Sequence, residues 1–223
     1  MPALPTLRAV TDDFRLVHED ADLLVLDKPA GLLCVPGRGE DKQDCLSARV
    51  QARWPGSLVV HRLDMATSGL VLMARSAEVQ RALGDAFAQR QVWKRYEAVV
   101  DGLAQSKSWS VIDAPMMADW PRRPLQKIDA AGKPSVTRWR TLEAWPERGE
   151  RGSTRLLLEP QTGRSHQLRL HLAHIGHPIL GDALYGDARV QAAAPRLLLH
   201  ATVLQFRHPA TGAAVRFESP APF

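Results

Sequence analysis

The chain has 223 residues, of which 45% are hydrophobic and 24% charged, with a formal net charge of +5 and two cysteines. These values are ordinary for a globular protein and exclude a disordered chain, a disulfide scaffold and a zinc ribbon. No signal peptide opens the sequence and no apolar run is long enough to cross a bilayer, so we expect a cytoplasmic protein that contacts no membrane.

The first third of the chain predicts short strands and one short helix. Residues 14–37 are typical of strands separated by turns. Residues 44–54 predict a helix capped by Asp44, because apolar side chains recur there at four-residue spacing. Residues 58–64 and 70–75 predict two antiparallel strands joined by a turn.

The rest of the chain continues this alternation. Ser76 is expected to cap an amphipathic helix, and the strand at residues 93–102 places Tyr96 on the same face as Ala98 and Val100. Residues 114–133, rich in Pro, Arg and Trp, predict an irregular excursion. Further elements are expected as strands at 135–145 and 155–160, a helix that ends at Gly176, and a closing hairpin at 200–219.

Strands outnumber helices in this pattern, and most of them pair with antiparallel neighbours. The sequence therefore predicts an α+β fold, with a mixed, mostly antiparallel sheet and flanking helices. No linker or internal repeat divides the chain. We expect one domain over residues 14–223, preceded by an N-terminal extension over residues 1–13, and a monomer.

Positive charge is concentrated in one stretch. Residues 122–140 contain six basic residues against Asp129 alone, whereas residues 11–27 contain six acidic residues against Arg15 alone. A basic face of this kind suits a polyanion such as nucleic acid. Within the stretch, Arg122, Arg123 and Lys127 are the candidates for contact with nucleic acid.

Asp64 is the leading candidate for chemistry. It ends the predicted strand at residues 58–64 and is followed by a turn, and a rigid element holds a catalytic group better than a loop does. Arg164 lies just before a predicted helix start, where backbone N–H groups also favour an anion. An Arg164 that faces Asp64 would keep the carboxylate ionised and fixed.

The sequence motifs of several other kinds of active site are absent. His166, His171, His174 and His177 do not have the H-E-x-x-H spacing, so we expect no metal site. Nucleotide-binding loops of the G-x-x-x-x-G-K-[ST] and G-x-G-x-x-G types are absent, as is a G-x-S-x-G nucleophile elbow. A glycosidase would need a second carboxylate beside Asp64, and none is evident.

Several motifs, in order, resemble those of the RluA-type pseudouridine synthases. The stretches are "LDKPAGLLCVPG", "HRLDMATSGL", "KRYEAVVDG", "TGRSHQLRLHLAHIGHPILGDALYG" and "PRLLLHA", and the resemblance runs from about residue 14 to the C-terminus. "CVPGR", "DWPRRPLQK" and "APRLLLHA" are most similar to the subgroup that modifies both 23S rRNA and tRNA. Arg122 and Leu125 depart from that subgroup's pattern.

The resemblance implies an isomerase with the pseudouridine synthase fold that converts a chosen uridine in RNA into pseudouridine without cofactor or metal. Asp64 would be the catalytic carboxylate, acting either on the sugar carbon or on a sugar proton. Tyr96 would stack on the uracil, Arg164 would pair with Asp64, Arg62 would hold the nucleotide or fill the gap it leaves, and Leu199 would line the pocket.

The expected partners are a 23S rRNA stem-loop and the tRNA anticodon stem-loop, modified at its first loop uridine. Strands begin near Phe14, so we expect no S4-type RNA-binding domain. Two alternatives stay open, namely a synthase with a single RNA substrate and a non-catalytic RNA-binding assembly factor.

Overall fold

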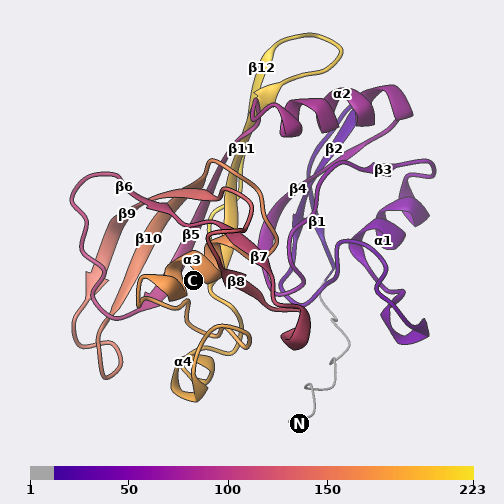
Figure 1. Ribbon diagram of the computed structural model, residues 1–223. Coiled ribbons are helices and arrows are strands. Elements are labelled where there is room, and N and C mark those ends of the chain that lie inside the picture. The colour runs from indigo at the N-terminus through magenta and orange to yellow at the C-terminus, as the bar shows by residue number, and fades with distance from the viewer. Residues whose placement is uncertain (1–12) are drawn as a thin grey trace.

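The computed structural model describes residues 13–223, so the predicted N-terminal extension lies outside the described residues except for Asp13. A large mixed sheet runs through the molecule with its strands in the order β1-β2-β4-β11-β5-β10-β9-β6 (Figure 1). β3 pairs with β4, β12 pairs with β11, and β7 and β8 form a separate hairpin. The strands are β1 (Arg15–Glu19), β2 (Leu23–Lys28), β3 (Leu58–Val59), β4 (Ser68–Ala74), β5 (Trp93–Asp101), β6 (Ser110–Asp113), β7 (Met116–Ala118), β8 (Gln126–Ile128), β9 (Val136–Trp145), β10 (Ser153–Pro160), β11 (Leu199–Arg207) and β12 (Ala214–Glu218).

The helices pack beside this sheet rather than on one another. They are α1 (Leu46–Arg53), α2 (Ala77–Ala88), α3 (Gln167–His174) and α4 (Ala188–Ala192), with short 3-10 turns at Glu40–Lys42 and Trp120–Arg122. α1 and α2 lie against the β1–β4 part of the sheet, and α3 lies against β5, β9 and β10 (Figure 1). The predicted α+β fold with a mixed, mostly antiparallel sheet is confirmed.

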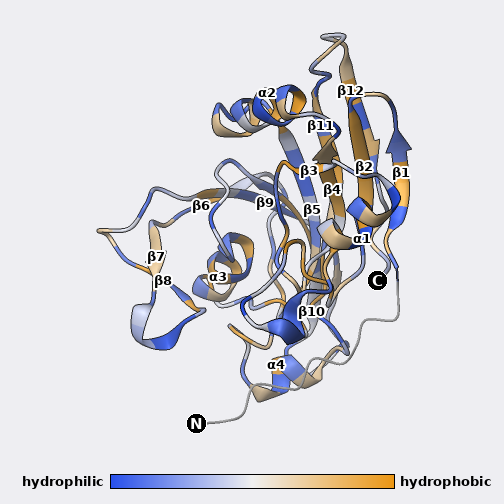
Figure 2. Cartoon of the chain, turned by 90° about the vertical axis from the view of Figure 1, so that its right-hand side faces the viewer, coloured by the Kyte–Doolittle hydropathy of each residue, from blue (hydrophilic) through white to orange (hydrophobic). Residues whose placement is uncertain are grey.

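The two halves of the sheet join where β4 and β11 run parallel, pairing Ser68 with His200 and Gly69 with Ala201. Gly69 has a φ of 110°, and a side-chain Cβ there would lie 2.4 Å from the Ala201 carbonyl oxygen. The glycine is therefore needed for this close approach of two backbones. All seven residues of β4 are buried, and Figure 2 shows apolar residues concentrated along β2 and β4.

The apolar core lies on both sides of this junction. Leu168 and Leu172 of α3 pack on Ala98, Val100 and the inner residues of β10, as the predicted spacing required. Leu46 and Val50 of α1 pack on β2 and β4. The Ser76 side chain accepts the Val79 backbone N–H and caps α2, which confirms that prediction.

Three local predictions were wrong. α1 begins after Cys45, and Asp44 does not cap it, because its carboxylate is bound instead by Arg49 at 2.6 and 2.7 Å. β3 ends at Val59, so Asp64 follows the strand in an irregular segment. Residues 114–133 are not wholly irregular, since they contain the β7–β8 hairpin.

Within residues 13–223, no helix is long and apolar enough to span a membrane.

Candidate active site

A cleft opens where the segment after β3, strand β5, the start of β11 and the start of α3 meet. Its volume is about 270 Å³, near the lower end of the range for small-ligand pockets. The predicted residues Arg62, Asp64, Tyr96, Arg164 and Leu199 all line it. The cleft therefore brings together side chains from four separate parts of the chain.

The segment that carries Asp64 leaves the sheet but is held by specific hydrogen bonds. The fully buried Lys28 donates from Nζ to the carbonyls of Leu32 at 2.7 Å and Met65 at 3.1 Å, and burial lowers its pKa to about 8. The Leu63 N–H donates to Cys34 Sγ at 3.2 Å. The Asp64 carbonyl accepts the Thr67 N–H at 3.1 Å. These bonds make the loop a defined support for the carboxylate, in place of the predicted strand end.

Each oxygen of the Asp64 carboxylate faces a different residue of the α3 region. Oδ2 lies 3.6 Å from Nη1 of Arg169, and Oδ1 lies 3.9 Å from Nε2 of His166. The Asp64 side chain keeps 28% of its surface exposed, whereas Arg169 keeps 4%. The carboxylate thus faces the cleft with a buried cation behind it.

Arg169 is itself held by Asp182. Its Nε and Nη2 donate to the two Asp182 oxygens at 2.9 and 2.6 Å, a bidentate pair that is fully buried on the aspartate side. Asp182 Oδ1 also accepts the backbone N–H groups of Leu184 and Tyr185. The preceding Gly181 has a φ of 77° and leaves no room for a Cβ beside the Arg196 carbonyl. This turn fixes the direction of the Arg169 guanidinium.

Arg164 does not occupy the predicted place. The structure forms no ion pair between Arg164 and Asp64 among the described residues, and Arg164 instead donates to the Pro134 carbonyl at 3.4 Å. It is exposed at the mouth of the cleft, because it precedes α3, whereas Arg169 lies on the helix and reaches inward. The ion-pair partner expected for Asp64 is therefore Arg169.

Tyr96 and Leu199 form the apolar side of the cleft. Tyr96 projects from β5 between two core clusters, and Leu199 begins β11, where it pairs with Ala98. Burial and the nearby Asp64 charge raise the pKa of Tyr96, so its hydroxyl stays protonated at neutral pH. The ring is thus a neutral aromatic surface beside the carboxylate.

The cleft is strongly cationic. Its lining within residues 13–223 includes four cations, and Asp64 is its one carboxylate; the cations are Arg62, Lys94, Arg164 and Arg169. Sequence reasoning missed Lys94, which lies two residues before Tyr96 on the same face of β5 and has its pKa lowered by burial. Such a surface attracts phosphate groups.

The predicted RNA-binding residues belong to the β7–β8 hairpin, outside the cleft lining: Lys127 lies in β8, and Arg122 and Arg123 lie in the connection between the two strands. Arg122 pairs with Asp119 at 2.6 Å, and Lys127 pairs with Asp129 at 2.7 Å. Arg123 instead stacks on the exposed ring of Trp120, with its guanidinium carbon 3.3 Å from the ring centroid. The local positive charge is therefore partly neutralised, which the sequence count did not reveal.

The four clustered histidines have separate surroundings. His171 is buried between Thr137 Oγ1 and the Ala114 carbonyl, each at 3.0 Å. His177 lies 3.0 Å from the Asp101 carbonyl, His166 faces the cleft, and His174 is exposed.

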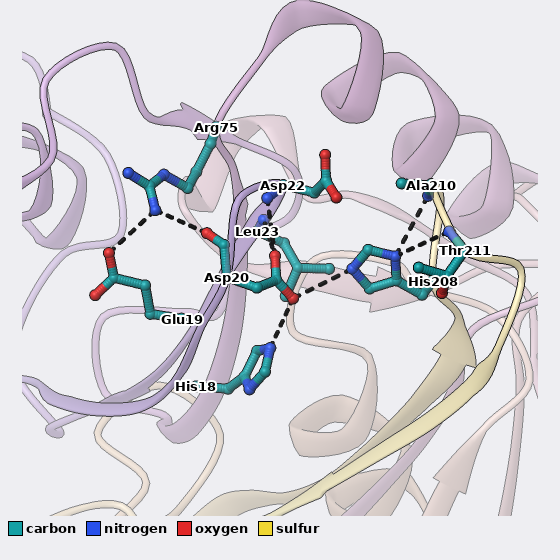
Figure 3. Close-up of polar contacts among 9 residues, drawn as sticks. All are labelled: His18, Glu19, Asp20, Asp22, Leu23, Arg75, His208, Ala210 and Thr211. Carbon is teal, nitrogen blue, oxygen red and sulfur yellow. Dashed lines mark hydrogen bonds and ion pairs between the residues drawn. The ribbon is translucent and has the colours of Figure 1, made fainter.

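One group of side chains within residues 13–223 does have the spacing of metal ligands: atoms of Asp20, Asp22 and His208 lie within 4.8 Å of one another. Figure 3 shows that Asp20 is surrounded by donors, with His18 Nε2 at 2.7 Å and His208 Nε2 at 3.2 Å. His208 Nδ1 accepts the N–H groups of Ala210 and Thr211, so Nε2 carries the proton and is not free to coordinate a metal. The group links the β1–β2 turn to the β11–β12 hairpin.

Comparison with known proteins gives a consistent result. The family model described as RNA pseudouridylate synthase matches residues 22–174. The dual-specificity RNA pseudouridine synthases RluA of Escherichia coli strain K12 and of Yersinia pestis are each 43% identical to the chain over 93% of its length, and the match covers 93% and 99% of those proteins.

Solved structures agree. Human RNA pseudouridylate synthase domain containing 1 superposes with a TM-score of 0.80 at 28% identity, over 97% of this chain and 86% of that one. Human RNA pseudouridylate synthase domain containing 4 has the same fold, with a TM-score of 0.70 at 24% identity over 93% and 88% of the two chains.

Proposed function

Because the chain belongs to the RNA pseudouridylate synthase family, it is an isomerase that converts uridine in RNA into pseudouridine, and we propose that Asp64 is its catalytic carboxylate. The observation that carries the proposal is the position of Asp64. It is the one carboxylate lining a cationic cleft in the described part of the chain, and a buried Arg169 lies 3.6 Å behind it. A carboxylate held in this way is directed at whatever enters the cleft.

The target uridine enters the cleft after leaving its base stack. The uracil stacks on the Tyr96 ring and contacts Leu199, which together make the apolar wall. Arg62, Lys94 and Arg164 contact the phosphates on either side, since they line the cleft and form no ion pair with a carboxylate of residues 13–223. Arg164 thus receives a phosphate-binding role in place of the ion pair first predicted for it.

The isomerisation needs no external reactant. The N1–C1′ bond of the uridine breaks, the uracil turns within the cleft, and C5 forms a new bond to C1′. The proton lost from C5 is balanced by the proton gained at N1. Asp64 assists at the sugar, either by attack on C1′ or by removal of a sugar proton, and both roles require the ionised carboxylate.

The names of the relatives describe dual specificity, which supports two RNA substrates for this chain. We infer that the chain modifies a 23S rRNA stem-loop and the first uridine of the tRNA anticodon loop, as a monomer. Phosphate contacts position RNA but read little sequence, so two loops of similar shape can serve one cleft.

The test uses the purified protein and Asp64→Asn on rRNA and tRNA stem-loop fragments, with pseudouridine mapped at single-nucleotide resolution. We expect wild-type modification of both RNAs and a loss of roughly 10⁴-fold or more in Asp64→Asn, with RNA affinity nearly unchanged. Asp44→Asn, which removes an exposed carboxylate away from the cleft, is the matched control.

Turnover by a carefully purified Asp64→Asn protein would show that this carboxylate is not the catalyst. Modification of only one of the two RNAs would establish a single-substrate synthase and reject dual specificity. Binding without modification of either RNA would support the assembly-factor alternative.

A further inference from the structure

A chain of hydrogen bonds leads from the β7–β8 hairpin to the cleft. The backbone N–H of Gln126, the first residue of β8, donates to the Tyr185 hydroxyl at 2.9 Å. The same hydroxyl lies 2.9 Å from Nδ1 of His166. The other ring nitrogen of His166 faces Asp64 Oδ1 at 3.9 Å. Tyr185 does not line the cleft, so it acts from behind it.

The donors along this chain fix where the protons lie. Burial raises the pKa of Tyr185 to about 12, so its hydroxyl keeps its proton at neutral pH. Because Gln126 donates to the Tyr185 oxygen, the hydroxyl proton is available for His166 Nδ1. Burial, helped by the nearby Arg169 and Arg62 charges, lowers the pKa of His166 against the opposing effect of Asp64 and Asp182. His166 is therefore neutral, with its proton on Nε2, the atom that faces Asp64.

The backbone of His166 is also specialised. It has a φ of 58°, a left-handed conformation that non-glycine residues adopt uncommonly, and it is the residue that precedes α3. This conformation directs the ring toward the cleft, and the side chain keeps only 14% of its surface exposed. A strained residue at such a place motivates a functional explanation.

Resting on the proposed function, we propose that His166 is a positioning residue that donates a hydrogen bond from Nε2 to Asp64, and that Tyr185 holds it in the required tautomer. The 3.9 Å separation is too long for a hydrogen bond in the free protein, and it shortens when the nucleotide fills the cleft. Arg169 then holds Oδ2 and His166 holds Oδ1, so the plane of the carboxylate is set from both sides. Because Gln126 of β8 donates to Tyr185, a shift of the hairpin would also shift Tyr185 and the His166 ring that it holds.

Two substitutions at His166 separate the effect of its Nε2 hydrogen-bond donor from the effect of its left-handed backbone conformation. His166→Asn suits the left-handed conformation but is too short to reach Asp64, whereas His166→Gln can present an N–H near the Nε2 position. We expect the single-turnover rate of pseudouridine formation to fall about 10²-fold in His166→Asn, to recover in part in His166→Gln, and to leave the RNA dissociation constant unchanged in both. A wild-type rate in His166→Asn, or equal losses in two folded variants, would overturn the proposal.

The tautomer of His166 can also be measured directly, without an assay of turnover. ¹⁵N NMR of the imidazole should show an unprotonated Nδ1 and a protonated Nε2 for His166 in the wild-type protein. Tyr185→Phe keeps the ring beneath Arg169 but removes the hydroxyl, and should produce a mixture of tautomers. A proton on Nδ1 in the wild-type protein would reject the proposal even if Asp64→Asn proves inactive, whereas the Asp64 result alone tests the proposed function.

Discussion

At the scale of single residues, the Tyr96 hydroxyl is the least explained group in the cleft. No hydrogen bond joins it to another residue within 13–223, although its ring packs between two core clusters. The side chain is half-buried and lines the cleft, so the hydroxyl is available to a bound base. The ring and the hydroxyl can therefore have separate roles, one in holding the base and one in chemistry.

Substituting Tyr96 distinguishes these roles. Tyr96→Phe should keep RNA binding, because the stacking surface remains, whereas Tyr96→Ala should weaken binding by about 1–3 kcal/mol for one lost base stack. Fluorescence titration with an RNA stem-loop measures both, and thermal unfolding checks that the Ala protein is folded. A loss of turnover in the Phe protein, with its RNA binding kept, would assign chemistry to the hydroxyl. Equal binding by the Phe and Ala proteins would reduce Tyr96 to a core residue.

Asp64, Tyr96 and Leu199, which the sequence motifs singled out, line one cleft, but the motifs did not identify the arginine behind Asp64. Choosing between Arg164 and Arg169 requires the helix start and its rotation, since only a residue within α3 directs its side chain back over the preceding turn. One signal was present. Arg169 lies between two leucines in the predicted helix, which indicates that it is buried. Because a buried arginine needs a carboxylate partner and Asp182 is the next acidic residue, the sequence offered Asp182 as that partner.

At the scale of elements, the β7–β8 hairpin shows what local sequence could not reveal. Its strands have three residues each and pair with one another as a separate two-stranded sheet, and Met116 of β7 also forms a single bridge to Lys133. So short a hairpin is marginal alone and depends on tertiary contacts, here including the bond from Gln126 to Tyr185. Tyr185 lies 59 residues away, so no local pattern predicts this contact.

The hairpin's ion pairs lead to a prediction about RNA binding. Neutralising Arg122, Arg123 and Lys127 together should flatten the salt dependence of RNA affinity by at most about three phosphate contacts, and Arg123→Gln alone by about one, because Arg123 is not paired with a carboxylate. Dissociation constants at several salt concentrations give the slope. The matched control removes the same charge from exposed positions outside the cleft: Lys107, Arg148 and Arg207. Equal slopes for the hairpin triple variant and the wild-type protein would place the RNA contacts elsewhere.

At the scale of the whole molecule, a buried polar chain joins strands that are distant in sequence. Arg196 donates to Ser68 Oγ, which lies 2.8 Å from His200 Nδ1. His200 Nε2 lies 3.3 Å from Ser219 Oγ, which donates to Asp27 at 2.6 Å. β2, β4, β11 and the C-terminal segment are thereby connected around one neutral imidazole. Full satisfaction of its members makes such a network tolerable inside a core.

This network makes stability depend on pH in a defined direction. Burial and the nearby Arg196 lower the pKa of His200 from 6.5 to about 4. As pH falls below 6.5 the unfolded chain takes up a proton at His200 that the folded protein refuses until about pH 4, so the free energy of unfolding decreases across this window. Between about pH 7.5 and pH 5 the loss due to His200 is about 2 kcal/mol.

Urea unfolding at the two pH values measures this loss. The free energy of unfolding of His200→Gln should decrease by about 2 kcal/mol less than that of the wild-type protein, because glutamine does not titrate. His174→Gln, at an exposed histidine, is the matched control. The same pH dependence in His200→Gln and wild-type protein would mean that His200 is not held neutral in the fold.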